Sequence, residues 1–280
     1  MISVNKNFLY LFLLLASNSI VLAQNSFEDQ FVYAKTLYEN EKYFDAVTEF
    51  KRLLFFDDSK SYNYKANFLI GLSYKNGAKF SEAIEYFAKA ELNSKIPEEI
   101  FAARLEIIKL NILRRTTVRA FTMLDSLDND SRFINQKDEI NYWRGWAYIF
   151  ADDWKKASLT FKEIQGGNYL SEFCDSISKD LYNSQLAKIL SIIPGAGQFY
   201  TGEYVSGLIS IGWNVLWGYL TINAFIEDRI FDGVIVGTLL WWRFYSGNIQ
   251  NAEKFAAEKN LQKTNSALHF LQSGYSGNKP

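Results

Sequence analysis

The chain has few of the residues that build catalytic and metal sites. Its 280 residues include a single cysteine, Cys174, and a single histidine, His269, in the C-terminal tail. One cysteine excludes an internal disulfide, and one Cys with one His gives no spacing for a Cys/His metal site. The position of the only histidine in the tail argues against a Ser/His/Asp triad. We therefore expect no enzymatic activity, no metal and no cofactor. A site built only from Asp, Glu and Tyr is the remaining enzymatic alternative.

Neither sign of charge is in excess. Lys and Arg number 30, Asp and Glu number 31, and the formal net charge is −1. A chain without a basic excess lacks the electrostatic footprint of a nucleic-acid-binding protein. We therefore expect no nucleic acid among its partners.

The N-terminus has the three-part pattern of a secretory signal peptide. Lys6 precedes an apolar run over residues 8–16, and Val21 and Ala23 stand three and one positions before a cleavage site ahead of Gln24. We assign residues 1–23 to this signal peptide, and an uncleaved membrane anchor is the alternative. Either way, the segment that follows is expected outside the cytoplasm.

What the sequence does contain is a spacing of 37 residues that recurs in four successive stretches. Small or apolar side chains occupy the equivalent positions in each stretch. These positions are Ala34, Gly71, Ile108 and Gly145; Ala46, Ala83, Ala120 and Ala157; and Phe50, Phe87, Leu124 and Phe161. A fixed period of this length indicates stacked helical repeats, which usually bind other molecules.

The second stretch shows the pattern most clearly. Gly71 and Tyr74 lie on its first expected helix, and Ala83 and Phe87 lie on its second. A small residue, an aromatic, an Ala and a Phe in this order resemble the tetratricopeptide repeat. The resemblance implies an all-α solenoid of about four helix pairs, in which small residues let helices approach closely and aromatics fill the space between pairs.

We assign residues 24–168 to this repeat array and residues 169–190 to a capping helix. Gly166 and Gly167 provide a helix stop. An apolar stripe at helical spacing follows them at Leu170, Phe173, Ile177 and Leu181. A terminal amphipathic helix of this kind covers the last open face of a solenoid.

In such arrays the first helices of the repeats line a groove for a protein or peptide partner. The resemblance places Lys35, Tyr38, Leu72, Lys75, Asn76, Lys109, Tyr142, Trp146 and Phe150 in this groove. The last three recur every four residues and form one aromatic stripe. The stripe is either a platform for a partner or packs beneath the next helix, and we favour packing.

Residues 191–247 differ in character from the repeats. Val205–Ile226 contains 22 residues without a charge, about 33 Å as a helix, which is enough for a hydrocarbon layer. A polar turn and a second apolar stretch, Ile230–Ser246, follow it. We expect a transmembrane-type helical hairpin in membrane lipid. The alternative is a hairpin buried in a soluble domain, because the turn lacks the positive charge expected on a cytoplasmic side.

Small and amide side chains predict tight packing within this hairpin. Gly233 and Gly237 lie four residues apart on one helix face, which permits close helix contact. Asn214 and Asn223 are expected to hydrogen-bond inside the hairpin, since an unpaired amide in lipid is costly. A hairpin that forms homo-oligomers is the alternative use of this close packing.

A glycine-rich motif precedes the hairpin. Its residues are Pro194, Gly195, Gly197, Gln198, Tyr200 and Gly202. The pattern P-G-x-G-Q-x-Y-x-G followed by an apolar hairpin resembles an uncharacterised domain family of bacterial envelope proteins, which implies a location and no activity. We expect a structural turn at the membrane surface, with residues 248–280 forming a surface helix and a flexible tail.

These features together predict a non-enzymatic cell-envelope protein. Its repeats would bind partner proteins in the periplasm, and its hairpin would hold it at the inner membrane of a Gram-negative-type bacterium. One alternative is a membrane component whose hairpin oligomerises to assist transport or assembly of envelope components. Another is a soluble periplasmic or outer-membrane-associated adaptor with a buried hairpin.

Overall fold

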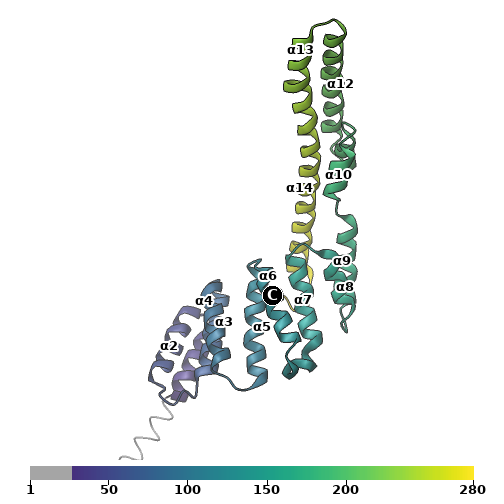
Figure 1. The fold of residues 1–280 in the computed structure, drawn as a ribbon. Coiled ribbons are helices and arrows are strands. Elements are labelled where there is room, and N and C mark those ends of the chain that lie inside the picture. Colours follow the sequence, from purple (N-terminus) through teal and green to yellow (C-terminus); the bar gives the residue numbers. More distant parts are fainter. Residues whose placement is uncertain (1–26) are drawn as a thin grey trace, which may run out of the picture. The chain divides into compact units, whose positions relative to one another are not determined.

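The computed structural model describes residues 27–280, which form a succession of helices (Figure 1). The predicted signal peptide, residues 1–23, lies outside the described residues. Regular structure in the described part of the chain is helical, without strands, which confirms the predicted all-α class. The chain divides into two compact units between Ser171 and Glu172, inside helix α9 (Asn168–Asp180).

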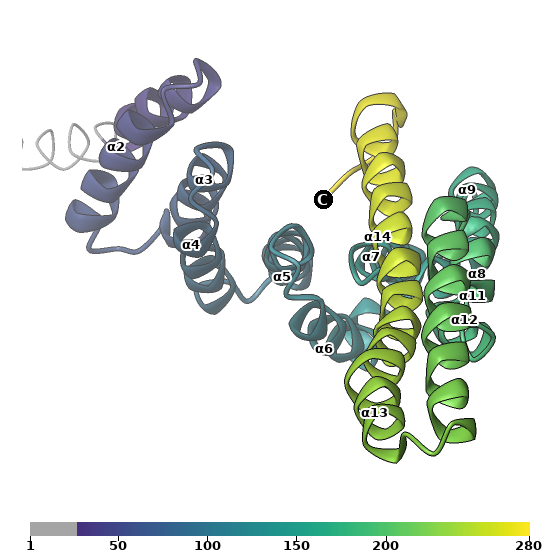
Figure 2. The ribbon, with the colours of Figure 1, turned by 90° about the horizontal axis from the view of Figure 1, so that it is seen from above.

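The first unit is built from helices that pack in chain order. They are a helix over residues 27–39, α2 (Tyr43–Phe56), α3 (Asn63–Asn76), α4 (Phe80–Leu92), α5 (Pro97–Leu113), α6 (Thr117–Asp128), the 3-10 segment η1 (Ser131–Gln136), α7 (Lys137–Phe150) and α8 (Trp154–Lys162). From α2 to α8 each α-helix contacts the next one, and Figure 2 shows α2 to α6 in this succession. The core of this unit is therefore built from neighbours in sequence.

One close approach recurs between paired helices of this unit. A Cβ added at Gly71 would lie 2.7 Å from a ring carbon of Phe87, and one added at Gly145 would lie 2.5 Å from a ring carbon of Phe161. Both phenylalanines are completely buried. The glycines stand at equivalent positions of the 37-residue period, so in both pairs a missing side chain makes room for the same ring of the second helix.

The turn inside each helix pair recurs with the same period. A non-glycine residue with positive φ follows the first helix at Glu41 (60°), Ala78 (57°), Arg115 (55°) and Asp152 (59°). The next amide then bonds at 2.8–2.9 Å to the carbonyl five residues earlier, in the pairs Lys42 to Leu37, Lys79 to Tyr74, Thr116 to Asn111 and Asp153 to Tyr148. This is a left-handed helix C-cap. The third pair keeps it although its side chains depart most from the repeat pattern.

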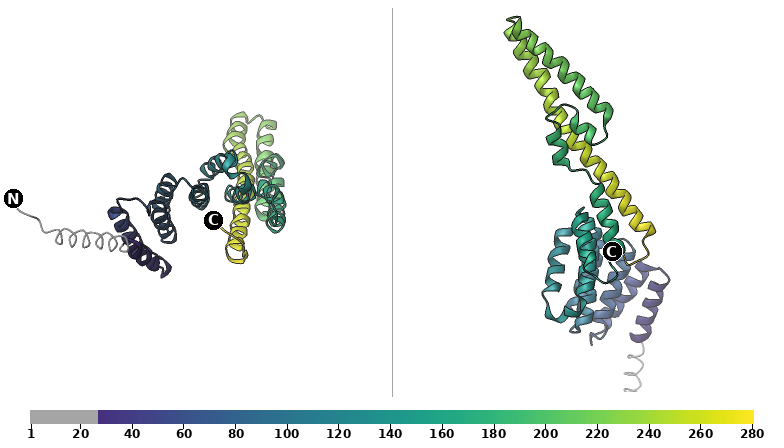
Figure 3. Two further views of the ribbon diagram at one scale, coloured as in Figure 1. Left: turned by 90° about the horizontal axis from the view of Figure 1, so that it is seen from below. Right: turned by 90° about the vertical axis from the view of Figure 1, so that its right-hand side faces the viewer.

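The second unit is organised around one long helical rod. Its elements are α9, α10 (Ser184–Leu190), α11 (Ala196–Tyr200), α12 (Tyr204–Ile226), α13 (Ile230–Ile235), the π-helical segment η2 (Val236–Trp242) and α14 (Arg243–Gly274). The last three follow one another without a break, as Figure 1 and the right-hand view of Figure 3 show. Helices α10, α11 and α12 each pack against α14, and α12 also packs against α13 and η2.

Two predicted boundaries differ in the structure. The single capping helix predicted over residues 169–190 is divided into α9 and α10, because the Asn183 side chain accepts a hydrogen bond from the Leu186 amide at 2.9 Å and so begins a new helix. The boundary predicted at residue 247 is absent, since α14 continues to Gly274. Gly247 has no positive φ that would end a helix there.

Helix α12 buries small and polar side chains and exposes large apolar ones. Its buried residues are Gly207, Ser210, Asn214, Gly218, Thr221 and Ala224. By contrast, Val205 is 73% exposed, Leu208 64% and Val215 66%. With 23 residues, a mean hydropathy of 1.3 and only 22% of its most apolar window buried, α12 is long and apolar enough to span a membrane. Among the described residues no other helix combines this length and hydropathy.

Candidate functional site

The first helices of the pairs carry polar and aromatic side chains that contact one another. Tyr38, on the helix over residues 27–39, accepts a hydrogen bond from Asn76 Nδ2 of α3 at 3.3 Å. Burial is the main cause of the raised pKa of the Tyr38 hydroxyl. The hydroxyl therefore stays neutral near pH 7 and joins the first helix pair to the second.

A triad of charges continues this contact toward the third pair. The Lys75 ammonium of α3 lies 2.9 Å from one oxygen of Glu106 on α5, and the Lys109 ammonium lies 2.7 Å from the other. All three side chains are at most 22% exposed. Burial alone would raise the pKa of Glu106, but Lys109 and Lys75 outweigh it and hold the pKa below its ordinary value. Two cations therefore share one ionised carboxylate.

The triad reaches the fourth pair through a cation–π contact. The Lys109 ammonium lies 4.6 Å from the centre of the Trp143 ring on α7, a contact that contributes about 0.5–2 kcal/mol. We call the connected residues Tyr38, Lys75, Asn76, Glu106, Lys109 and Trp143 the polar row. It crosses all four first helices and carries one positive charge in excess.

Four of the nine predicted groove residues belong to the polar row. They are Tyr38, Lys75, Asn76 and Lys109. Lys35 does not, because it is exposed and pairs with Glu39 on its own helix at 3.4 Å. Leu72 is half-buried and packs against the apolar cluster around Phe87.

The predicted aromatic stripe on α7 packs inside the unit. Trp146 is 2% exposed. Tyr142 is half-buried with its ring centre 5.8 Å from that of Phe161 on α8. Phe150 is half-buried, with the Arg115 guanidinium 6.0 Å from its ring centre. These three side chains therefore do not form an open platform.

Sequence reasoning missed Glu106 and Trp143. Glu106 lies in a helix that is mostly apolar, three positions before Lys109 and so on the same helix face. A carboxylate between apolar residues of such a helix is the signal that could have revealed it, because a buried carboxylate needs a paired cation. Trp143 was overlooked because the four-residue spacing of the aromatic stripe pointed to Tyr142, one position away.

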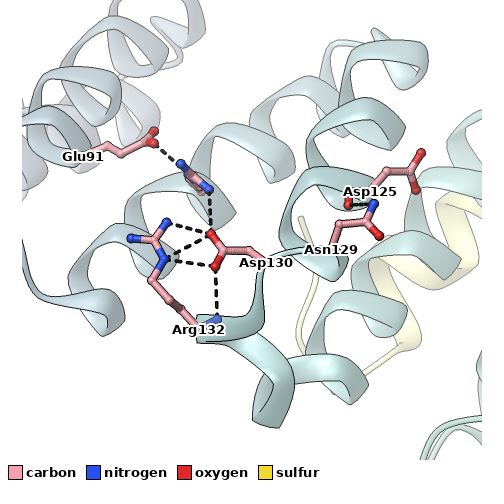
Figure 4. Close-up of polar contacts among 6 residues, drawn as sticks. Glu91, Asp125, Asn129, Asp130 and Arg132 are labelled. Atoms are coloured by element: carbon pink, nitrogen blue, oxygen red, sulfur yellow. Dashed lines mark hydrogen bonds and ion pairs between the residues drawn. The ribbon is translucent and has the colours of Figure 1, made fainter.

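A second charged group connects α4 and α5 to η1, as Figure 4 shows. Arg104 donates a hydrogen bond to Glu91 at 2.6 Å and lies 3.9 Å from Asp130. Arg132 holds the same Asp130 carboxylate with contacts of 2.7–3.2 Å. Hydrogen bonds from Arg132 are the main cause that lowers the pKa of Asp130 to about 2. Two cations and two anions balance here, so the group braces the chain and has no charge left for a ligand.

The glycines of the sequence motif stand where a side chain would collide. A Cβ at Gly195 (φ +86°) would lie 2.6 Å from the Gly207 carbonyl oxygen. A Cβ at Gly197 would lie 1.9 Å from Ser191 Oγ and 2.2 Å from the Ala187 carbonyl oxygen. Helix α11 can therefore approach α10 and α12 this closely only because both positions are glycine.

The polar residues of the motif complete the same junction. Gln198 is completely buried, and its Nε2 donates to the Asn248 carbonyl of α14 at 2.8 Å. The Tyr200 hydroxyl accepts a hydrogen bond from the Asn183 amide at 3.0 Å. Gly202 (φ +76°) lies in the turn between α11 and α12. The motif is thus a structural joint that fastens α10, α11, α12 and α14 together.

The glycine pair of α13 and η2 packs against α12. A Cβ at Gly233 would lie 2.9 Å from the Phe225 ring, and one at Gly237 would lie 3.0 Å from the Thr221 methyl group. Both glycines therefore serve packing within this unit, so neither of them is open to a second copy.

The two amides expected inside the hairpin bond locally. Asn214 Nδ2 donates to the Ser210 carbonyl of its own helix at 2.8 Å. Asn223 Nδ2 donates to Glu227 Oε1 at 3.3 Å, at the exposed end of α12. Neither amide therefore makes a hydrogen bond from α12 to the facing rod.

Comparison with protein-family models, with curated proteins and with solved structures finds no match to this chain. Across residues 27–280, no three His, Cys, Asp or Glu side chains gather closely enough to hold a metal ion. The features of the described residues that bear on function are the polar row and the exposed apolar surface of α12.

Proposed function

We propose that this chain is a non-enzymatic cell-envelope protein. In this proposal the first unit is a tetratricopeptide-like solenoid that binds partner proteins, and α12 with the facing part of the rod is a helical hairpin held in the membrane. The protein is exported, with the solenoid in the periplasm of a Gram-negative-type bacterium. Each part of the proposal rests on a different observation.

The recurring turn and the recurring Gly/Phe contact support the solenoid. The same left-handed cap follows the first helix of all four pairs at 37-residue intervals. Side-chain resemblance alone is weaker in the third pair, but the backbone geometry there is the same. Repeats of this kind contact mainly their neighbours and present one extended face, which suits them to binding another protein.

The reversed polarity of α12 is the observation that carries the membrane part. Leaving a Val, Leu or Ile side chain in water forgoes about 1.5–3 kcal/mol relative to burial. Val205, Leu208 and Val215 are each more than 60% exposed, while Ser210 and Asn214 on the opposite face are buried. A hydrocarbon environment removes the cost of exposing the large apolar side chains. The facing rod shields the polar side chains of Ser210 and Asn214 from that environment.

The polar row supports the choice of partner face. It lies on the first helices, where the resemblance expects a groove, and its two lysines share one carboxylate. The excess positive charge fits a partner segment that bears carboxylates. Because the glycine pair is occupied within the hairpin, glycine-mediated oligomerisation is not part of this proposal.

Site-specific photo-crosslinking in intact native cells tests the partner face. A photoreactive amino acid is placed at Lys35, an exposed position on the first helix, and at Leu92, which is 83% exposed at the end of α4. The proposal predicts a discrete adduct from position 35 and none from position 92. Lys109→Ala should weaken this adduct, whereas the control Lys89→Ala, which removes an exposed cation on α4, should not. Equal adducts from both positions, or none from position 35, would refute the proposed face.

A further inference from the structure

A short segment at the base of α12 exposes apolar side chains that the packing of the second unit leaves open. This base segment, residues 189–195, runs from the last two residues of α10 to Gly195 of the motif. Ile189 is 61% exposed, Ile192 61% and Ile193 70%. No charged residue occurs between Lys188 and Glu203, and the Lys188 ammonium is engaged by Glu253 of α14 at 2.9 Å.

The base segment lies beside α12 rather than beyond its end. A Cβ at Gly195 would lie 2.6 Å from the Gly207 carbonyl and 2.9 Å from the Ile211 side chain. These residues are three and seven positions inside α12, about 4 and 10 Å along it. The chain at Gly195, two residues after the exposed Ile193, therefore lies against the first turns of α12.

The backbone of the base segment is largely self-satisfied. The amides of Ile192 and Ile193 donate to the carbonyls of Ile189 and Leu190, each at 3.1 Å. The Ile192 carbonyl accepts a hydrogen bond from the Tyr245 hydroxyl at 3.0 Å, and Pro194 has no amide hydrogen. Non-helical backbone is tolerated at membrane depth only when its polar groups find partners inside the protein.

We propose that the base segment is a third membrane-contacting element. Ile189, Ile192 and Ile193 enter the acyl-chain boundary of the leaflet that surrounds the start of α12. The occupant of this surface is lipid, because the surface carries no charge and its C-terminal end lies against the first turns of the proposed membrane helix α12. The inference rests on the proposed membrane hairpin and extends it, since it turns the motif junction from a connector into part of the membrane anchor.

Depth-dependent fluorescence quenching tests this proposal on the full chain. Cysteine is introduced singly at Ile193, at Leu208 of α12 (64% exposed) and at Leu261 of α14 (56% exposed). Each variant is labelled with an environment-sensitive maleimide fluorophore and reconstituted in phosphatidylethanolamine/phosphatidylglycerol vesicles with acyl-chain spin labels. The native thiol does not interfere, because Cys174 is buried and burial raises its pKa to about 12. A fourth label at Ile189 guards against a local disturbance at a single position.

The proposal predicts blue-shifted emission and at least twofold quenching at positions 189, 193 and 208, and unquenched aqueous emission at position 261. Aqueous emission at 189 and 193 with quenching at 208 would overturn the base-segment proposal and leave the membrane hairpin intact. Blue-shifted but unquenched emission at 189 and 193 would show that protein covers the segment and would also overturn it. Aqueous emission at all positions would overturn the hairpin as well.

Discussion

Exchanging one buried pair of side chains tests whether the helix pairs obey one packing rule. In the second pair, Gly71 makes room for the ring of Phe87. In the third pair, Ile108 and Leu124 hold the equivalent positions, and both are completely buried. If the positions are structurally equivalent, the combination of Ile and Leu fills the same space as the combination of Gly and Phe. The double variant Gly71→Ile/Phe87→Leu should therefore pack where each single variant fails.

The expected energies follow from the contacts. Gly71→Ile alone places a Cβ 2.7 Å from the Phe87 ring and adds further carbons, so overpacking costs about 3 kcal/mol. Phe87→Leu alone leaves a partial cavity and costs about 1–2 kcal/mol. The double variant should lose only about 1 kcal/mol, which gives a coupling energy of about 3–4 kcal/mol.

Hydrogen exchange measured by mass spectrometry on the full chain in detergent reports these energies locally, as opening free energies of α3 and α4. The matched control is Gly212→Ile in α12, where an added Cβ meets nothing within 4 Å. It should leave α3 and α4 unchanged. Single-variant losses that simply add in the double variant, with a coupling below about 0.5 kcal/mol, would refute the packing rule.

Four further predictions follow from single side chains. Because its folded pKa of about 2 lies below the ordinary 3.8, Asp130 should contribute stability that is complete above about pH 4 and is lost as the pH falls toward 2; Asp130→Asn should flatten this part of the pH dependence of thermal unfolding. Gly197→Ala would bring a Cβ within 2.2 Å of two oxygen atoms and should destabilise α10 and α11 by about 3 kcal/mol or more in hydrogen exchange. Glu106→Gln leaves two half-buried ammonium groups without a counter-charge and should cost about 1–3 kcal/mol in α3 and α5 exchange. Cys174, with its pKa raised to about 12 by burial, should react with maleimide only after denaturation.

Each of these predictions has an outcome that contradicts it. If Asp130→Asn left the pH dependence of thermal unfolding below about pH 4 unchanged, Arg132 would not bind the carboxylate in solution. Normal exchange of α11 in Gly197→Ala would mean that the junction is looser than described. A Glu106→Gln variant as stable as the parent would show that Lys75 and Lys109 do not depend on the carboxylate, and rapid labelling of native Cys174 would show that α9 opens readily.

The sequence was informative where a pattern repeats and where apolar length is unusual. The all-helical class and one helix able to span a membrane are both found in the structure. Repeat period and uncharged length are properties of many residues at once, so single exceptions do not hide them. The identity of the repeats and the hairpin in lipid stay predictions.

Other features depend on single contacts that no periodicity reveals. The break between α9 and α10 depends on one Asn183 cap. The pairing of Glu106 with Lys75 joins residues 31 positions apart on different helices. Trp143 rather than its neighbour Tyr142 faces Lys109, because the rotation of α7 about its axis decides which of the two rings lies nearest. Such contacts follow from how helices pack, and so required the structure.

Alkaline carbonate extraction of membranes from cells that express the full chain tests the central claim most directly. A parallel chain in which residues 203–247 are replaced by a flexible polar linker serves as the control. The account predicts that the full chain stays in the membrane pellet after washing, whereas the control chain is released. Release of the full chain into the supernatant would contradict the claim that α12 and the facing rod reside in lipid.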